Sequence, residues 1–522
     1  MHTIEAVLGL VVVAIGVAAV ADRLRTPAPS VLVLVGLGVG FIPGFTSLHV
    51  SPELVTLGVL PPLLFSAAQQ ISLIDLRRVW RPVAALAVGL VAVTALAVAA
   101  VTHAVAPAIS GAVAFTFGAV LASTDPVAVS ALSRDLRLPE RVGTLVQAES
   151  LFNDATSLVL FEVAVTVAVR GHVTAAEAAL RFVTLGVGGA ALGAAVGWLT
   201  GAVLRHTHEP TVQAALTVVS PYVAAVVAQA IDVSPVTAVI VAGIMLGRRR
   251  VRTRHFGGRL VSGSVYDVVV FVLENAIFAV IGLELASFIR ALPHNDRMAT
   301  GVLLAVVTVT LLTARAAALA ATVWLPRLWP RRPAPAERLG WQVGAIVTWA
   351  GARGVIPLAA ALSIPTHTDS GAPFPHRALI LVVSAGVVVV TLVVQGTTLA
   401  PLVRRLGVAT PEGDLTAEML RARHAMALAA LDRLDALTVS VEASEPEVGR
   451  IRAELQQQAD VTRDRLDRSS DGDLQASSRL RAGVLAAQAD ELARLRVGGE
   501  LSAEGFRHLQ RQLDLENARL RD

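Results

Sequence analysis

Polar side chains interrupt a long apolar run in the stretch ESLFNDATSLVLFEV. On a helix, Ser150, Asp154 and Ser157 share one face, while Glu149 and Asn153 form the row beside it. An ionised carboxylate in such a run has to pair with a charge, bind a cation or take up a proton. Oxygen-rich clusters suit Na⁺ and other hard cations, whereas copper and zinc prefer nitrogen and sulfur. The stretch therefore indicates a cation and proton site, or alternatively two carboxylates that only hold helices together by hydrogen bonds.

A second polar group lies in LASTDPVAVSAL, where Asp125 is followed directly by Pro126. Proline removes a backbone donor and disturbs the preceding turn, which leaves carbonyl groups without helical partners. Irregular backbone at membrane depth persists only where protein or a water-filled cavity satisfies it. The sequence thus predicts either a broken helix that presents oxygens to an ion, or a simple kink in which Asp125 caps the freed amides.

A third group, in AIVTWAGARGVIPLAAALS, combines an arginine with residues that disturb a helix. Arg353 keeps its proton at any relevant pH, and it therefore requires a buried partner such as Glu149 or Asp125. Two glycines allow close backbone approach, and Pro357 disturbs the helix again. We expect Arg353 to be an ion-pair anchor rather than a cation ligand.

The elements that hold these groups follow from the composition. The chain has 522 residues, of which 54% are hydrophobic and 16% charged, and its mean hydropathy is +0.65. Too few polar side chains remain to cover a soluble protein of this size. Apolar stretches of about 20 residues, long enough to cross roughly 30 Å of hydrocarbon, recur over most of the chain. The class is an all-helical, polytopic membrane protein; the lack of cysteine excludes disulfides and thiolate metal sites, and we expect no cofactor.

We predict about thirteen membrane spans. Spans one to six and eight to thirteen can form inverted repeats, with the seventh as linker. In that arrangement the break at Asp125 in span five corresponds to the break at Arg353 in span twelve, so that two discontinuous helices cross at the centre. The predicted spans are about 3–21, 30–44, 51–70, 83–105, 111–131, 145–169, 182–204, 211–230, 235–247, 267–288, 299–323, 341–363 and 378–401.

Arginines concentrate in the loops that follow odd-numbered spans, including RRRVRTRHFGGR at 248–259. By the positive-inside rule, these loops face the cytoplasm. We therefore expect a multi-pass protein of the cell membrane, in contact with lipid, with its N-terminus outside and its C-terminus in the cytoplasm. This topology explains the basic clusters, so we expect no nucleic acid partner.

Residues 409–522 differ in character from the membrane region at 1–408. Both 415–440 and much of 447–521 show apolar residues at three- and four-residue spacing among dense charges. That pattern is typical of amphipathic helices in water. We predict a helical cytosolic tail, which either packs and supports a dimer or regulates the membrane region.

Five motifs occur in order along the chain: ASTDPVAVSAL, ESLFNDATSLVLFEV, ENAIFAVIGLEL, WAGARGVIPLAAAL and VVQGTTLAPLVRRLG. Together they resemble the monovalent cation:proton antiporter-1 family, and most of all its bacterial Na⁺/H⁺ exchangers. The resemblance covers about residues 1–408, and PPLLFSAAQQI is similar to the family's third helix. It implies a secondary transporter rather than an enzyme, exchanging Na⁺, or Li⁺ or K⁺, for H⁺. It also implies a homodimer of thirteen-helix protomers, each with a mobile core domain and a dimerisation domain.

The resemblance also implies an ion site. Asp154 would bind H⁺ and the cation in turn, in an alternating-access cycle. The Ser150 side chain and the Thr124 backbone would complete the ion shell. An Asn153–Asp154 pair, in place of two aspartates, implies a single exchanged carboxylate and electroneutral one-for-one exchange.

The same resemblance implies supporting roles around the site. Asn153 would fix the unwound region, Asp125 would balance helix-end charges at the crossing, and Glu149 would pair with Arg353. One position departs from the family, because several relatives carry a glutamate ligand just after PPLLF where this chain has Ser66. The ion shell would accordingly be thinner, or water would complete it.

Other polar residues are embedded in the predicted spans. Asn275 fits a position of the family, and we expect the rest to pair helices or to lie at the membrane interface. The remaining residues are Glu162, Glu274, Glu284 and Arg315.

Two alternatives stay open. A K⁺/H⁺ antiporter or a cation channel could use a related scaffold, and the flux of a channel would respond to voltage rather than to an opposing pH gradient. An intramembrane aspartyl protease would need two membrane aspartates. Tyr266–Asp267 supplies one expected dipeptide, but the partner GxGD motif is absent.

Overall fold

The chain forms two compact units, Met1–Ala409 and Thr410–Asp522, in a computed structural model. The regular elements that the structure describes are all helical, with one isolated bridge between His367 and Pro373. Beyond 467 the structure describes only residues 488, 491, 492 and 494. Up to 467 it describes residues 2–467 except 24–27, 43–53, 72–75, 78–79, 81–82, 125–139, 171–172, 208, 251–255, 292–296, 325–340, 370, 409–411 and 439–444.

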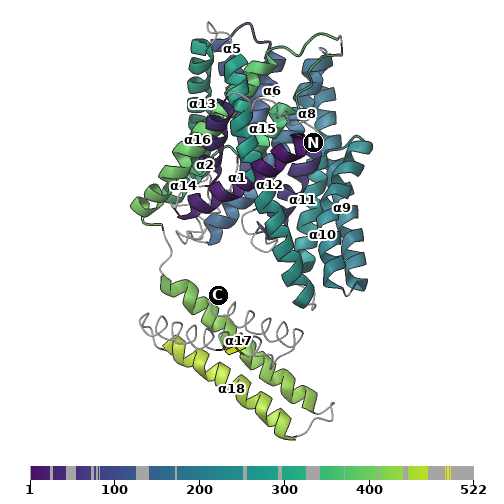
Figure 1. The fold of residues 1–522 in the computed structure, drawn as a ribbon, viewed down its shortest axis with the longest axis vertical. Coiled ribbons are helices and arrows are strands. Elements are labelled where there is room, and N and C mark those ends of the chain that lie inside the picture. The colour runs from purple at the N-terminus through teal and green to yellow at the C-terminus, as the bar shows by residue number, and fades with distance from the viewer. Residues whose placement is uncertain are drawn as a thin grey trace. The chain divides into compact units, whose positions relative to one another are not determined.

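The first unit is a bundle of apolar helices (Figure 1). A helix lies within each of the thirteen predicted spans, while the number of crossings and the inverted repeat stay predictions. Seven helical segments in the described residues, in η2–α5, α8, α9, α10, α12, α13 and α16, are long and apolar enough to cross a membrane. The elements are α1 (His2–Arg23), α2 (Ala28–Gly40), η1 (Leu54–Val59), α3 (Leu60–Gln70), η2 (Ala85–Leu90), α5 (Val91–Val105), α6 (Gly111–Leu121), α8 (Glu140–Arg170), α9 (Ala175–His206), α10 (Pro210–Ala230), α11 (Pro235–Arg250), α12 (Phe256–Ala291), α13 (Arg297–Trp324), α14 (Trp341–Trp349), α15 (Val355–Leu362) and α16 (Arg377–Leu406).

The predicted interruption around Arg353 is present. Helix α14 ends at Trp349, residues 350–354 are not helical, and α15 begins at Val355. Pro357 lies in the first turn of α15, where backbone N–H groups have no intrahelical acceptor and proline is tolerated. Near the other predicted break, α6 ends at Leu121, four residues before Asp125. Asp125 and Pro126 lie outside the described residues.

Small residues bring several helices into backbone contact. A Cβ atom added at Gly36 of α2 would lie 2.2 Å from the Ala279 carbonyl oxygen of α12. At Gly193 of α9, an added Cβ would lie 2.2 Å from the Ala238 carbonyl oxygen of α11. Close approach of this kind is typical of helix pairs in membranes, where packing rather than water exclusion drives association.

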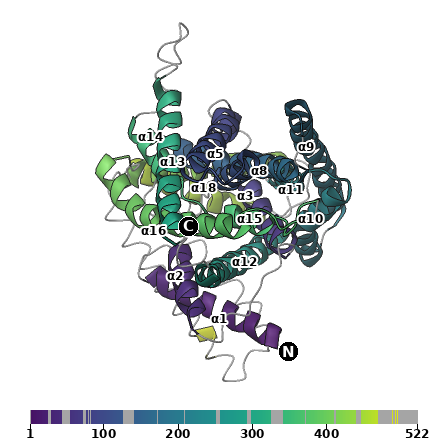
Figure 2. The same cartoon turned by 90° about the horizontal axis from the view of Figure 1, so that it is seen from above.

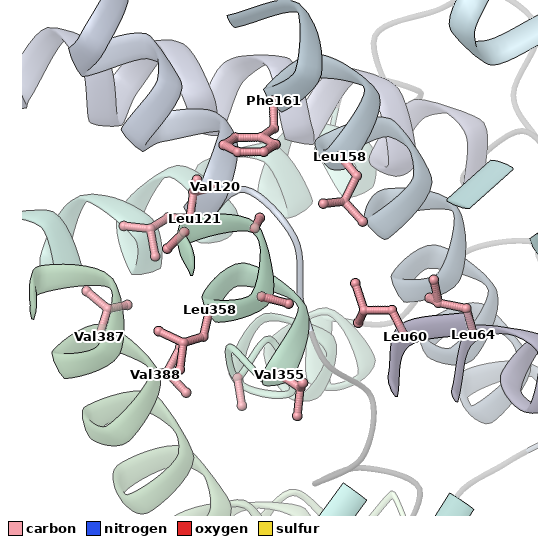
Figure 3. Close-up of a cluster of buried hydrophobic side chains, with 14 of the residues drawn as sticks. Leu60, Leu64, Val120, Leu121, Leu158, Phe161, Val355, Leu358, Val387 and Val388 are labelled. Carbon is pink, nitrogen blue, oxygen red and sulfur yellow. The ribbon is translucent and has the colours of Figure 1, made fainter. Parts of the chain in front are cut away.

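The interrupted helix lies among the other site-bearing helices. Seen from above, α9 and α10 lie at one flank of the first unit, α13, α14 and α16 lie toward the other, and α15 lies between them (Figure 2). Apolar side chains of α3, α6, α8, α15 and α16 gather around the break (Figure 3). These buried or nearly buried side chains include Leu60, Leu64, Val120, Leu121, Leu158, Phe161, Val355, Leu358, Val387 and Val388.

The second unit contains the two long amphipathic helices α17 (Glu412–Thr438) and α18 (Glu445–Asp467). They pack as an antiparallel pair. Arg452 Nη2 lies 2.6 Å from Asp435 Oδ1, and His424 Nδ1 lies 3.1 Å from the Ala459 carbonyl oxygen. Two of the amphipathic helices predicted in the tail are therefore present, whereas the predicted stretch beyond 467 lies almost wholly outside the described residues.

Candidate cation site

Helix α8 presents the predicted polar face to the interior of the first unit. Glu149, Ser150, Asn153, Asp154 and Ser157 are each at most 3% exposed. Ser150 and Ser157 occur one turn before and nearly one turn after Asp154, so the three side chains lie along one face of the helix. A carboxylate is thus buried between two hydroxyl groups.

The hydroxyl groups on this face cover the C-terminal end of α6. Ser157 Oγ donates to the Ala119 carbonyl oxygen at 2.8 Å. Ser150 Oγ donates to the Thr124 carbonyl oxygen, three residues beyond the end of the helix. Ala119 lies in the last turn of α6, where carbonyl groups lack the usual i+4 donor, so the Ser157 hydroxyl gives this carbonyl a further donor. Of the three predicted ion-shell residues, the structure joins Thr124 and Ser150 directly and places Asp154 on the same face.

Asn153 connects α8 to Thr124, which follows the end of α6. Its Nδ2 donates to Thr124 Oγ1 and to Glu149 Oε1, both at 3.2 Å. The carboxylate accepts only, so it requires the amide nitrogen rather than the amide oxygen on its side. Asn153 Oδ1 is buried and has no hydrogen-bond partner among the described residues. Within the described part of the chain, this amide oxygen can therefore accept one further hydrogen bond or a cation.

Glu149 forms its ion pair with Arg315 of α13. Arg315 Nη1 donates to Glu149 Oε1 at 3.0 Å and Nη2 donates to Oε2 at 2.9 Å, while both side chains are at most 3% exposed. Arg315 also donates to the Val347 carbonyl oxygen of α14 from Nε and Nη2. The prediction that Glu149 pairs with Arg353 is therefore wrong. A Cβ atom at Gly351 would lie 2.4 Å from Arg315 Nε, so the glycine makes room for this guanidinium beside the break.

Arg353 instead holds the end of α6. Its Nη1 donates to the Ala122 carbonyl oxygen at 3.1 Å and to the Ser123 carbonyl oxygen at 2.5 Å. A positive charge at the C-terminus of a helix is attracted to the negative end of the helix dipole. Arg353 is thus an anchor between the two interrupted segments, bonded to carbonyl groups rather than to Glu149. Asp125, the other predicted partner of Arg353, lies outside the described residues.

The other embedded polar residues have local or peripheral environments. Asn275 Nδ2 donates to the Phe271 carbonyl oxygen of its own helix at 2.6 Å. Ser66, at the position of the missing glutamate, is half-buried on α3, and this helix packs against α8. Asp267 is exposed on α12, away from the buried face of α8. Glu162 and Glu274 are half-buried, and Glu284 is buried.

Comparison with known sequences identifies the family. The profile described as "Sodium/hydrogen exchanger, transmembrane" matches residues 9–405. The chain belongs to this family. This chain is 34% identical to an uncharacterised Na⁺/H⁺ exchanger of Mycobacterium tuberculosis. The alignment of 536 residues covers 99% of this chain and 97% of that protein. The members of the sodium/hydrogen exchanger family are antiporters, so this protein is a multi-pass membrane transporter and not a protease.

Two further relatives bear on the fold and the substrate class. The exchanger is 28% identical to the sodium, potassium, lithium and rubidium/H⁺ antiporter of Bacillus subtilis, over 70% of this chain and 56% of that protein. The structure of the sodium proton antiporter MjNhaP1 of Methanocaldococcus jannaschii matches with a TM-score of 0.63 at 19% identity. The match covers 78% of this chain and 99% of MjNhaP1, which shows that the two share a fold. Membership of the sodium/hydrogen exchanger family makes this protein a cation and proton exchanger, and the likeness to MjNhaP1 shows the shared fold alone.

Proposed function

We propose that this exchanger moves one Na⁺ against one H⁺, with Asp154 as the group that both ions bind. The observation that carries the proposal is the bidentate pair between Arg315 and Glu149 beside the buried polar face of α8. The fixed guanidinium compensates Glu149, so the charge that changes during the cycle belongs to Asp154. One exchanged carboxylate makes one-for-one exchange electroneutral.

Competition at a single carboxylate couples the two fluxes. Burial penalises the ionised form of a carboxyl group, and either a proton or a cation removes that penalty. A loaded, neutral site can therefore move between the two sides of the membrane more easily than an empty, charged one. Alternating access of a fixed midplane site then needs no energy source besides the opposing gradient.

The neutral oxygens around Asp154 suit a hard monovalent cation. The Ser150 hydroxyl lies on the same helix face as Asp154 and bonds to the Thr124 carbonyl, while Asn153 Oδ1 is buried in the adjoining row of α8. Ser66 in place of a glutamate leaves no second carboxylate at that position, which agrees with a single exchanged charge. The B. subtilis relative is named for four alkali cations, so Li⁺, K⁺ and Rb⁺ should be compared with Na⁺.

We further propose the setting in which this site works. Residues 1–408 form the exchange domain of a homodimer in the cell membrane, with the N-terminus outside and the tail at 409–522 in the cytoplasm. The large exposed apolar side chains of α9 support a face in contact with lipid or a second protomer. They include Leu180, Val187, Trp198 and Leu199.

The proposal is tested with the full chain in proteoliposomes that contain a pH dye. A Na⁺ gradient should drive a pH change that is the same at clamped potentials of either sign. Asp154→Asn should abolish the pH change, whereas Asp267→Asn, on the exposed part of α12, should retain it. Exchange by Asp154→Asn, or a rate that depends strongly on potential, would overturn the proposal.

A further inference from the structure

Helix α16 holds both ends of the break between α14 and α15. Trp349, the last residue of α14, donates from Nε1 to Thr398 Oγ1 at 2.8 Å. Arg353 donates from its backbone N–H to Thr391 Oγ1 at 3.1 Å. The two threonines are seven positions apart in the sequence, so they occupy one face of α16 about two turns apart.

The hydroxyl of Thr391 is oriented to accept from Arg353. It donates to the Val387 carbonyl oxygen at 2.8 Å and approaches the Val388 carbonyl oxygen at 3.2 Å, so its own hydrogen is engaged within α16. A lone pair remains for the N–H of Arg353. Thr391 is 3% exposed and Arg353 is 2% exposed, so water cannot readily replace this bond.

The backbone bond sets the root of a side chain that reaches the exchange site. From that root, the Arg353 guanidinium donates to the carbonyl groups of Ala122 and Ser123. The next residue is Thr124, whose carbonyl accepts from Ser150. Two sets of hydrogen bonds, joined by the Arg353 side chain and by the backbone from Ser123 to Thr124, thus connect α16 through the break to a proposed cation ligand.

We propose that Thr391 is a positioning residue for cation binding, which acts by fixing Arg353 and through it the carbonyl of Thr124. The inference rests on the proposed function of the Asp154 site. It adds a residue on α16, a helix outside the proposed cation shell, that sets the affinity of this site for Na⁺. Threonines in membrane helices commonly bond only to the preceding turn. Thr397 on the exposed side of α16 does so, to Val393 and Val394. The bond to the break distinguishes Thr391.

The test compares Thr391→Val, Thr391→Ser and Thr397→Val in the full-length protein. Valine has nearly the shape of threonine but removes the acceptor, serine restores it, and Thr397→Val controls for losing a hydroxyl from α16. Thr391→Val should raise the half-saturating Na⁺ concentration about tenfold, which corresponds to one buried hydrogen bond left unmade. The maximal rate should change less, and serine should return the concentration to within about twofold of the parent value.

Hydrogen exchange gives a readout that does not depend on transport. The Arg353 amide should lose protection in Thr391→Val and keep it in Thr397→Val. Equal Na⁺ affinity in these two variants, or an affinity loss that serine does not rescue, would overturn the inference, and so would an Arg353 amide that stays protected in Thr391→Val. Asp154→Asn is measured in the same assay, and exchange by that variant would refute the proposed function. If Asp154→Asn loses exchange while Thr391→Val keeps the parent Na⁺ affinity, the positioning role alone is refuted.

Discussion

Breaking the buried pair between Glu149 and Arg315 should destabilise the protein more than removing both charges together. Loss of one partner from a buried ion pair costs about 3–5 kcal/mol, because the other charge is left uncompensated. The loss of stability in Glu149→Gln should lie near the lower end of this range, since Arg315 keeps its hydrogen bonds to the Val347 carbonyl oxygen. Arg315→Met should lie near the upper end, because the donors that remain to Glu149, including the amide of Asn153, are neutral. The double variant removes both charges and should cost less than either single change.

A double-mutant cycle measures this coupling, from unfolding of the detergent-solubilised protein at one pH and salt concentration. A second cycle between Glu149 and Arg353 is the matched control. The coupling of Glu149→Gln with Arg353→Met should be smaller than that with Arg315→Met, because the Arg353 guanidinium bonds to carbonyl groups at the end of α6 and not to Glu149. The reasoning fails if the Glu149→Gln penalty is relieved by Arg353→Met and not by Arg315→Met, or if both single variants cost less than about 1 kcal/mol.

Three further outcomes follow from the packing and the charges, each measured by thermal unfolding. Gly193→Leu should destabilise the first unit by more than about 2 kcal/mol, because the new side chain meets the backbone of α11. Gly186→Leu, which has open space around it, should be nearly neutral. Equal losses of stability in the two variants would contradict the close contact at Gly193. Both amide atoms of Gln395 are buried without a hydrogen-bond partner in the described part of the chain, so Gln395→Leu should raise the melting temperature, and a fall would mean that the amide is satisfied. Hydrogen bonds from Arg181 hold the pKa of Asp232 below its ordinary value of 3.8, so the pair stabilises the fold above about pH 4 and its contribution is lost as the pH falls through the depressed pKa. Asp232→Asn should therefore lower the melting temperature slightly at pH 6 and not at all at the acid end, and a difference that grows toward acid pH would contradict the sign.

Local spacing predicted much of the site. Ser150, Asp154 and Ser157 share a face because a helix repeats every 3.6 residues, and that geometry does not depend on the rest of the fold. The break near Arg353 also follows locally, from two glycines and Pro357. These features are determined by the few residues that surround them.

The choice of partner for Glu149 depends on tertiary structure. Arg315 and Arg353 are both embedded arginines that need a partner, and chain spacing does not distinguish them. What selects Arg315 is the crossing of α13 against the break, where Gly351 leaves room for its side chain. Arg353 is then directed to the end of α6 by its backbone bond to Thr391. Pairings between helices that are far apart in the chain are set by such packing, and the only signal in the sequence was an arginine inside an apolar span.

The dependence of Na⁺ affinity on pH tests the central claim most directly. If one proton and one cation compete for Asp154, the half-saturating Na⁺ concentration of the proteoliposome exchange should rise about tenfold for each unit by which the pH falls below the range where Asp154 is ionised. A slope near one, with the same maximal rate at saturating Na⁺, is the predicted result. A half-saturating concentration that does not change with pH would mean that the ions bind different groups, and a slope near two would mean that a second carboxyl group exchanges protons.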